Sequence, residues 1–316
     1  MTPEQIPIEA VRAASERLPR EVIDTPLIPL PHDRPAPDIH LKLETLGPIG
    51  SFKLRGAGNA LAGVDLDRGV WTASAGNMAQ AVAWMARAQG VDCSVVVPDH
   101  APQAKLQAIA RFGADVIRVP FEQWWDVIVT HRYDGLDGRF VHPVCDPAVI
   151  AGNATIGLEI LEQCPEVATV VVPYGGGGLS SGIAAAIRSA APHVDVFAAE
   201  VSTGAPLAAA FVAGAPVDVD HQPSFVDGIG SGRVLDEMWP LVSELLAGSV
   251  VVDLDEVAEA LRTIVGRARV VAEGAGAAPV AAALRGELDG PVVCVVSGAN
   301  INASALSEVL AGRTPA

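Results

Sequence analysis

The feature that most constrains the fold is the alternation of short apolar segments rich in β-branched residues with longer Ala-rich segments. The apolar runs are continuous rather than alternating with polar residues, which indicates strands buried on both faces. This rhythm predicts an α/β fold with open, mainly parallel sheets. The expected strands are Val70–Ala73, Cys93–Val97, Val116–Val119, Val167–Val172, Val194–Ala198 and Pro291–Val296.

The Ala-rich segments predict the helices between these strands. The expected helices lie near Asn77–Gln89, Pro102–Phe112, Asn153–Cys164, Leu179–Ala190, Val257–Ala268 and Ala277–Arg285. One strand-helix series occupies residues 67–145, and a second starts near residue 150. We therefore expect a small α/β domain over residues 67–145, inserted into a large domain made of residues 1–66 and 146–316.

Composition and charge indicate which classes of partner the protein can bind and in which compartment it works. The formal net charge is −16, from 37 acidic and 21 basic residues, which argues against a nucleic-acid partner because such a partner requires a basic face. No apolar run approaches the roughly 18 residues of a membrane helix, and the N-terminal segment is polar and acidic, unlike a secretory signal. A cytoplasmic protein is expected.

Cysteine and histidine usage gives no sign of a disulfide framework or a metal site. The cysteines at positions 93, 145, 164 and 294 are far apart, so buried reduced thiols are expected. The seven histidines form no spacing typical of metal ligands. We expect no bound metal.

The chain has only three lysines, and one of them stands in an unusual context. Lys42 lies in an alternating stretch where a charge on a strand face is expected, and Lys105 is expected on the polar face of a helix. Lys53 instead follows a tight Gly/Pro loop, Gly47–Gly50, at the start of a helix-like stretch. A helix N-terminus and Arg55 would both disfavour the ammonium form of Lys53, making a nucleophilic amine that can form an imine.

Two further turns follow expected strands. In Ser74-Ala75-Gly76-Asn77, small residues and a hydroxyl precede a helix, which suits a bound carboxylate, although Asn77 could equally be a simple N-cap. Ser297 follows the last buried strand, where ligands of open α/β sheets gather. Taken alone, a serine turn capping the final helix explains Ser297 better.

The segment Gly175–Gly178, between a buried strand and a helix starting at Leu179, predicts a phosphate site. Glycine lets backbone N–H groups approach the phosphate oxygens, and the helix dipole favours the anion. The same loop, with Glu200 at the end of the next strand, also fits a dinucleotide site. A nicotinamide oxidoreductase therefore stays as an alternative, although it leaves the Lys53 motif unexplained.

Together and in this order, these segments resemble the serine/threonine dehydratase (ammonia-lyase) and serine racemase branch of fold-type II pyridoxal-phosphate enzymes, and the likeness spans nearly the whole chain. The residues that carry it are Ser51–Ala57, Ser74–Gln80, Gly175–Gly178, Asp227-Gly228 and Ser297–Asn300. The resemblance implies a tryptophan synthase β-like fold, a pyridoxal 5'-phosphate cofactor, a small amino-acid substrate and a homodimer.

The resemblance also implies roles for individual residues. Lys53 would form an imine with the cofactor and act as the base on the substrate Cα, with Ser74 a second candidate catalytic residue. The cofactor would further be held by Phe52, Asn77, Gly175, Gly176, Gly177, Gly178, Leu179 and Ser297. The substrate site would consist of Ser51, Ser74, Ala75, Gly76 and Asn77. The implied reaction removes water from a β-hydroxy amino acid such as threonine or serine and yields a 2-oxo acid and ammonia.

The chain departs from the family pattern at several positions. Racemase members have a serine where Ala75 stands, so racemisation, the nearest alternative activity, is disfavoured. Met78 replaces the usual histidine of the asparagine loop, with an effect that the sequence does not specify. Relatives often carry a cation site beginning at the position of Glu200, but the next expected acidic position falls near Pro206. The chain ends soon after Asn300, so a C-terminal regulatory domain is not expected, and the presence of Lys53 argues against a non-catalytic amino-acid-binding protein.

Overall fold

The structure, a computed structural model, describes residues 1–101 and 103–315 and contains two sheets. The large sheet has the strand order β1-β2-β10-β7-β8-β9, and the small sheet has the order β5-β4-β3-β6. The large sheet is parallel except for the β1–β2 pair, and the small sheet is parallel throughout. The strands are β1 Leu27–Pro29, β2 Ile39–Leu43, β3 Val70–Ala73, β4 Cys93–Pro98, β5 Asp115–Val119, β6 Arg139–Phe140, β7 Thr169–Pro173, β8 Asp195–Val201, β9 Gly248–Val252 and β10 Val292–Val296.

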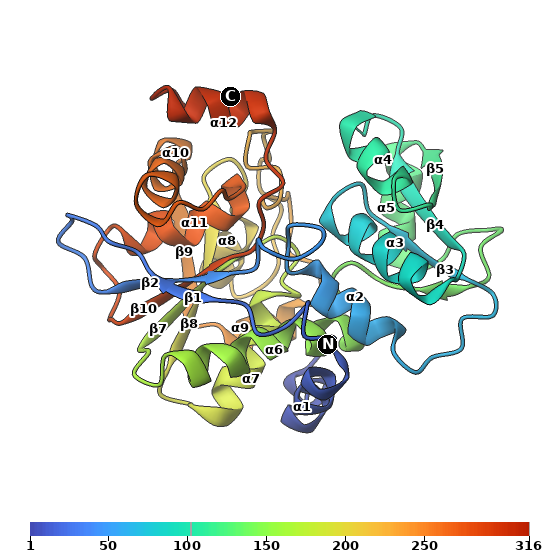
Figure 1. Ribbon diagram of the computed structural model, residues 1–316, viewed down its shortest axis with the longest axis horizontal. Coiled ribbons are helices and arrows are strands. Elements are labelled where there is room, and N and C mark those ends of the chain that lie inside the picture. Colours follow the sequence, from blue (N-terminus) through green and yellow to red (C-terminus); the bar gives the residue numbers. More distant parts are fainter. Residues whose placement is uncertain (102, 316) are drawn as a thin grey trace.

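Helices cover both sheets, and Figure 1 shows the small sheet and its helices beside the larger part of the molecule. The helices are α1 Ile8–Arg17, α2 Lys53–Leu61, α3 Asn77–Gln89, α4 Gln103–Ala110, α5 Phe121–Thr130, α6 Pro147–Gln163, α7 Ser180–Ala190, α8 Pro206–Ala213, α9 Trp239–Leu245, α10 Leu254–Thr263, α11 Gly274–Ala283 and α12 Ala303–Leu310, with a 3₁₀ turn Pro3–Gln5 and a π turn Ile264–Ala268. Within the described residues, no helix has both the length and the apolar character needed to cross a membrane.

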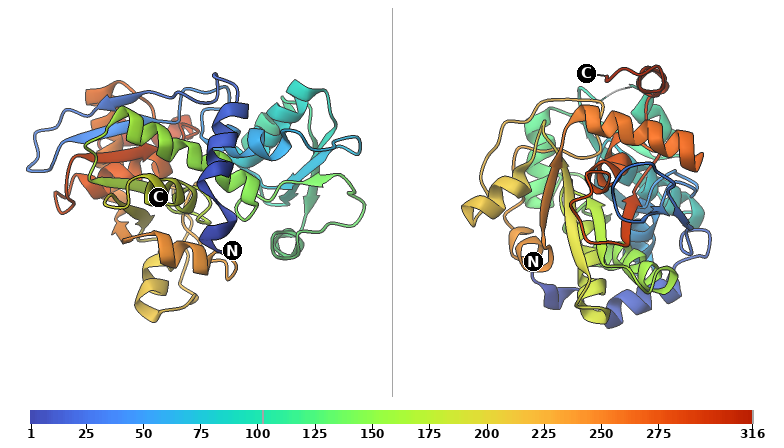
Figure 2. Two further views of the ribbon diagram at one scale, coloured as in Figure 1. Left: turned by 90° about the horizontal axis from the view of Figure 1, so that it is seen from below. Right: turned by 90° about the vertical axis from the view of Figure 1, so that its left-hand side faces the viewer.

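The central strands of the large sheet are buried on both faces, as the continuous apolar runs predict. Along β7, Val170 and Val172 belong to the core under α6 and α7, whereas Val171 between them belongs to the core under α10 and α11. Figure 2 shows helices on both sides of these strands. Successive side chains of a strand point to opposite faces, so every position of β7 must be apolar or small.

The predicted elements are confirmed, with shifts at their ends. β3 and α3 have the predicted bounds, but α6 begins at Pro147, six residues before the expected Asn153. Its true start is marked by Asp146, whose side chain accepts a hydrogen bond from the backbone N–H of Ala148, and by Pro147 in the first turn. The expected start of α4 at Pro102 lies outside the described residues.

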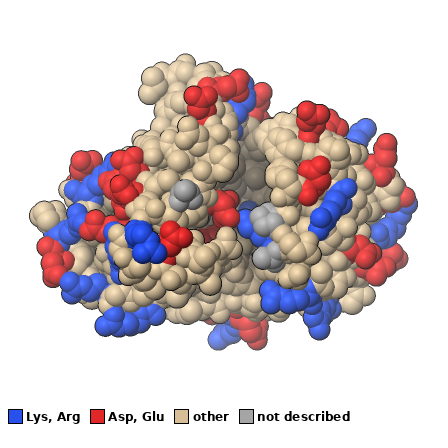
Figure 3. All heavy atoms as spheres, turned by 90° about the horizontal axis from the view of Figure 1, so that it is seen from above, with Lys and Arg blue, Asp and Glu red and all other residues tan. Residues whose placement is uncertain are grey.

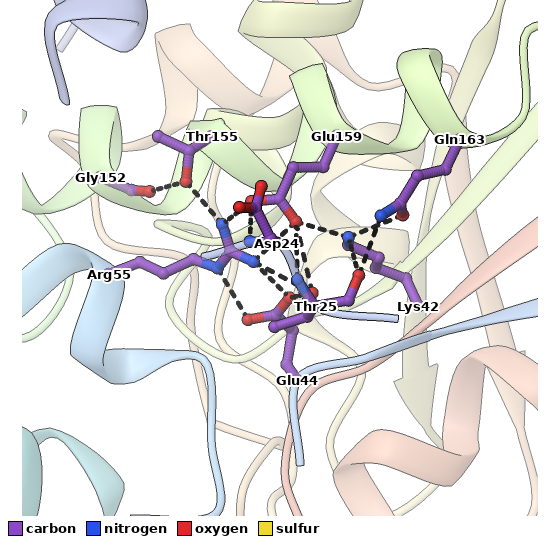
Figure 4. A network of polar contacts seen from close by, with 9 residues as sticks. All are labelled: Asp24, Thr25, Lys42, Glu44, Arg55, Gly152, Thr155, Glu159 and Gln163. Carbon is purple, nitrogen blue, oxygen red and sulfur yellow. Dashed lines mark hydrogen bonds and ion pairs between the residues drawn. The ribbon is translucent and has the colours of Figure 1, made fainter. Parts of the chain in front are cut away.

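A buried ionic cluster fixes α2 against β2 and α6 (Figure 4). The Arg55 guanidinium donates to both Glu44 and Glu159, with 2.8 Å between Arg55 Nε and Glu44 Oε2. Lys42 Nζ donates to Glu159 as well, and to the backbone carbonyl of Thr25 at 2.6 Å. The prediction that Lys42 is an ordinary strand-face charge is therefore wrong, because its side chain is 0% exposed and is paired inside the protein.

The charges in this cluster stabilise one another. Burial alone would raise the pKa of Glu159, but hydrogen bonding and charge from Arg55, followed by Lys42, outweigh it and lower that pKa to about 2. Burial likewise opposes the charge on Arg55, yet Glu44 and Glu159 keep its pKa above the ordinary value. Two cations and two carboxylates thus compensate each other in a region that excludes water.

Replacing Glu159 with alanine should lower the free energy of unfolding by about 3–5 kcal/mol, because Arg55 and Lys42 would stay buried without their shared partner. Chemical denaturation at neutral pH measures the change. Glu162→Ala, at an exposed position of the same helix, is the matched control and should change stability by less than about 0.5 kcal/mol. Equal losses in the two variants would contradict this account of the cluster.

Candidate active site

A pocket of about 410 Å³ lies where the carboxyl ends of strands from both sheets meet. The small sheet supplies segments that follow β3, β4, β5 and β6, and the large sheet supplies segments that follow β7 and β10. Figure 3 shows the surface hollowed between the two parts of the molecule. Loops after the carboxyl ends of parallel strands are the usual ligand site of such sheets.

Lys53, the first residue of α2, lines this pocket and donates from Nζ to the carbonyl oxygen of Pro143 at 3.1 Å. Burial lowers the pKa of Lys53 to about 8, and the charge of Glu273 opposes that shift. The sequence predicted the direction of this shift correctly but assigned it partly to Arg55. Arg55 instead pairs with Glu44 and Glu159, so desolvation is what makes the neutral amine accessible.

The glycine loop has the properties of an anion cradle. In the described part of the chain, the backbone N–H groups of residues 175–179 donate to no protein acceptor. A Cβ on Gly176 would come within 2.5 Å of Val144 Cγ2, and a Cβ on Gly178 within 2.7 Å of the Val144 carbonyl oxygen. Gly177 adopts φ +95°, in the left-handed region that favours glycine. Only glycine therefore lets this loop pass the Val144 segment with its N–H groups free.

His142 holds the segment that contacts both Lys53 and the glycine loop. Its Nδ1 accepts hydrogen bonds from the backbone N–H groups of Val144 and Cys145, at 3.0 and 2.7 Å. Its Nε2 lies 3.1 Å from the Ile128 carbonyl oxygen, to which it must donate. Burial, followed by the nearby His131, lowers the pKa of His142 to about 4, so the ring is neutral at physiological pH.

Sequence reasoning missed Glu273, a buried carboxylate in the pocket. It accepts from Asn77 Nδ2 at 3.1 Å and from the backbone N–H of Asn300 at 3.0 Å, and burial raises its pKa. Asn77 Oδ1 in turn accepts from Asn300 Nδ2 at 2.7 Å. Asn77 is thus no N-cap, since Gly76 occupies that position of α3. The only local signal for Glu273 was an acidic residue just before an Ala-rich helix, which is common at helix starts.

The structure brings nearly all of the predicted site residues together. Those that line the pocket are Phe52, Lys53, Ser74, Ala75, Gly76, Asn77, Gly175, Gly176, Gly177, Gly178, Leu179 and Ser297. Ser51 is not part of the lining, but it lies two residues before Lys53 in the chain, and its buried Oγ has no hydrogen-bond partner among the described residues. Ser297 does not cap the final helix, because Asn302 is the N-cap of α12. Lys105 lies on α4 as expected but also lines the pocket, where its Nζ pairs with Asp227 at 2.6 Å.

Glu200 does not serve the pocket. Its carboxylate is 0% exposed and accepts from the backbone N–H groups of Leu207 and Ala208 at the start of α8, each at 2.8 Å, and from Ser249 Oγ. It therefore caps a helix rather than meeting a ribose, which removes one of the two observations that favoured a nicotinamide cofactor and leaves only the glycine loop. The cysteines at positions 93, 145, 164 and 294 are free and buried, as expected.

Comparison with known proteins decides among the families that this geometry allows. The family model described as pyridoxal-phosphate dependent enzyme matches residues 18–298. The chain belongs to this family. An L-threonine ammonia-lyase of Geobacter sulfurreducens is 36% identical over 315 residues, covering 96% of this chain and 78% of the relative. An L-threonine ammonia-lyase of Thermotoga maritima is 39% identical over 281 residues, covering 86% and 70%.

Solved structures give the same family. The processed form of threonine deaminase isoform 2 from Solanum lycopersicum matches with a TM-score of 0.86 and 31% identity, over 96% of this chain and 93% of that one. Maize serine racemase matches with a TM-score of 0.85 and 28% identity, over 97% of each chain. The fold is therefore that of fold-type II pyridoxal-phosphate enzymes, as predicted.

The residues present fit pyridoxal phosphate. The backbone N–H groups of the glycine loop, which donate to no acceptor among the described residues, lie just before α7. Such an arrangement at a helix N-terminus binds phosphate. Lys53, with its lowered pKa, lines the same pocket, and Ser297 lines it from the end of β10. The phosphate, the carbonyl group and the ring nitrogen of the cofactor would each find a chemically suitable group in the pocket of this pyridoxal-phosphate enzyme.

In the cofactor-free protein, modification of Lys53 by an amine-selective reagent should follow a titration with its midpoint near pH 8, because burial favours the neutral amine. Peptide mapping after short labelling at a series of pH values measures that midpoint. Glu273→Gln should move it to lower pH, since the carboxylate favours the ammonium form. A midpoint near 10.5, the ordinary lysine value, would contradict the burial argument.

Gly178→Ala should weaken cofactor binding at least ten-fold, because the new Cβ would meet backbone rather than a movable side chain. Titration of the cofactor-free variant with pyridoxal phosphate, followed by absorbance, measures the affinity. Gly266→Ala, at a position with nothing within 4 Å of the new Cβ, is the control and should bind as the unmodified protein does.

Proposed function

We propose that this enzyme is an ammonia-lyase of the threonine dehydratase type, which converts L-threonine or a similar β-hydroxy amino acid to a 2-oxo acid and ammonia. The observation that carries the proposal is that Lys53 and the glycine loop, with its free backbone N–H groups, line the same pocket. It is supported by relatives named L-threonine ammonia-lyase at 36 and 39% identity over most of the chain.

Lys53 is the residue that would hold the cofactor and then take the proton from the substrate Cα. Its pKa of about 8 suits a base that exchanges protons near neutral pH. When bound, the cofactor supplies an electron sink for the charge left by that proton. The Pro143 carbonyl oxygen accepts a hydrogen bond from Nζ and so orients the amine within the pocket.

The remaining site residues orient the substrate and the cofactor. Ser74, Ala75 and Gly76, at the turn after β3, would hold the substrate carboxylate together with Ser51, which lies in the loop before α2. In the turn, Ser74 Oγ already accepts from the Gly76 N–H at 3.2 Å. Asn77 would meet the phenolic oxygen of the cofactor, positioned by Glu273 and Asn300. Phe52 is assigned to the cofactor ring, Ser297 to its pyridine nitrogen and Gly175–Leu179 to its phosphate.

The overall reaction balances without an external oxidant or reductant. Threonine loses its β-hydroxyl and one Cα proton as water, and the resulting enamine takes up water to give 2-oxobutanoate and ammonia. Racemisation requires a second proton-transfer group on the opposite face of the substrate. The family's racemase members place a serine at the position of Ala75, whose methyl group carries no proton to exchange, so the lyase is favoured.

Three further properties belong to the same proposal. Residues 67–145, which contain all strands of the small sheet, form the small domain, and residues 1–66 with 146–316 form the large, cofactor-binding one. The enzyme is a homodimer, as the family resemblance implies. It works in the cytoplasm, in keeping with its four free buried cysteines.

Purified enzyme supplied with pyridoxal phosphate should release 2-oxobutanoate and ammonia from L-threonine in equal amounts. Lys53→Ala should lower the rate by at least a thousand-fold, because it removes both the attachment point and the base. Detection of the 2-oxo acid by coupled reduction, with ammonia measured in parallel, tests this. Formation of D-amino acid without ammonia would identify a racemase instead.

A further inference from the structure

One wall of the pocket is built from aromatic rings. His100 follows β4, and Phe121 and Trp124 lie in the first turns of α5, which follows β5. The ring centroids of His100 and Phe121 are 5.7 Å apart, and those of Phe121 and Trp124 are also 5.7 Å apart. Three residues from two strand ends thus form one continuous ring surface, called here the aromatic wall.

The aromatic wall is unusual for this chain. Phe, Trp and Tyr make up only 4% of the residues. Phe121 is 50% exposed and the His100 side chain is 65% exposed, so large parts of both rings are not covered by protein. Because exposed aromatic surface that lines a pocket is covered when a ligand binds, the wall is suited to an apolar, flat group.

The rest of the pocket already supplies the polar contacts that any amino acid needs. Lys53, the turn after β3, and the Asn77–Glu273 pair are all polar or backbone groups suited to the amine, the carboxylate and the cofactor. A methyl group, as in threonine, would cover only a small part of the aromatic wall. The wall therefore has the surface to bind a larger substituent on the β-carbon.

The charges at the pocket do not favour an acidic substituent. A substrate with an acidic side chain would need a cation to bind its carboxylate. Lys105 could supply that cation, but its Nζ is already paired with Asp227 at 2.6 Å. Glu273 adds a further carboxylate to the lining. An acidic side chain would have to displace Asp227 and approach Glu273, so an uncharged ring is the better match.

We propose that the pocket selects β-hydroxy amino acids that carry an aromatic ring on the β-carbon, with phenylserine as the simplest member. This inference rests on the proposed function, since it names the substrate class of the same lyase site. The reaction breaks the Cα–H and Cβ–O bonds of phenylserine, and water then replaces the amine. The products are phenylpyruvate and ammonia, with no change in overall oxidation state.

The test compares holoenzyme activity on phenylserine, threonine, serine and 3-hydroxyaspartate. The unmodified enzyme should have its highest kcat/KM with phenylserine. Phe121→Ala should lower that value about ten-fold, mostly through KM, because the ring contact is made in the ground state as well as the transition state. The same variant should lower kcat/KM for threonine by a much smaller factor than for phenylserine, because a methyl group covers little of the aromatic wall. Val129→Ala, at an exposed position of α5 outside the pocket lining, is the control and should change neither value.

A binding measurement tests the aromatic wall without turnover. L-Phenylalanine lacks the β-hydroxyl that leaves, so its binding to the holoenzyme can be measured by calorimetry. It should bind more tightly than L-alanine. Phe121→Ala should reduce the ratio of these two affinities about ten-fold.

Three results would overturn the inference. They are phenylserine activity that is unchanged in Phe121→Ala, phenylserine activity that rises in it because the wall excludes large groups, and a higher kcat/KM for threonine, serine or 3-hydroxyaspartate than for phenylserine. Failure of all four substrates to yield a 2-oxo acid would overturn the proposed function instead. In that case the binding of L-phenylalanine would still decide whether the wall receives an aromatic ring.

Discussion

The position of Lys53 depends on a buried ionic cluster that Lys53 itself does not join. Arg55, two residues along α2, donates to Glu44 just after β2 and to Glu159 on α6, and Lys42 completes the balance of charge. Charges taken out of water are costly unless they are paired, so these elements are held in one arrangement. With α2 fixed in this way, its first residue has its amine at the pocket, where desolvation rather than a neighbouring cation lowers its pKa.

A second constraint is the close approach of the two parts of the chain around the cofactor site. The segment after β6 contacts the glycine loop so closely at Val144 that a Cβ on Gly176 or Gly178 would clash. His142, held neutral by burial, fixes that segment through two backbone N–H groups. The glycines thus serve two purposes, because they keep their N–H groups free for an anion and leave room for a segment of the small sheet.

Much of the fold and of the site could be predicted because the signals were local. A strand buried on both faces leaves a continuous apolar run, as in β7, and a strand that ends in glycines before a helix predicts an anion site. The predictions failed where the role of a residue depends on partners that are far away in the sequence. The stretch around Lys42 reads as an alternating strand, and only Glu159, more than a hundred residues away, makes its charge a buried one. Glu273 looked like an acidic residue at a helix start, and only Asn77 and Asn300 show that it belongs to the site.

The sequence by itself determined the class of fold and the cofactor family and singled out Lys53, since each conclusion rests on short segments that can be recognised one by one along the chain. The tertiary structure alone decided which charges are buried and paired, why the pKa of Lys53 is lowered, and which side chains line the pocket. The aromatic wall shows the difference well. His100 and Phe121 follow separate strands and meet only because parallel strands deliver their carboxyl ends to the same edge of a sheet.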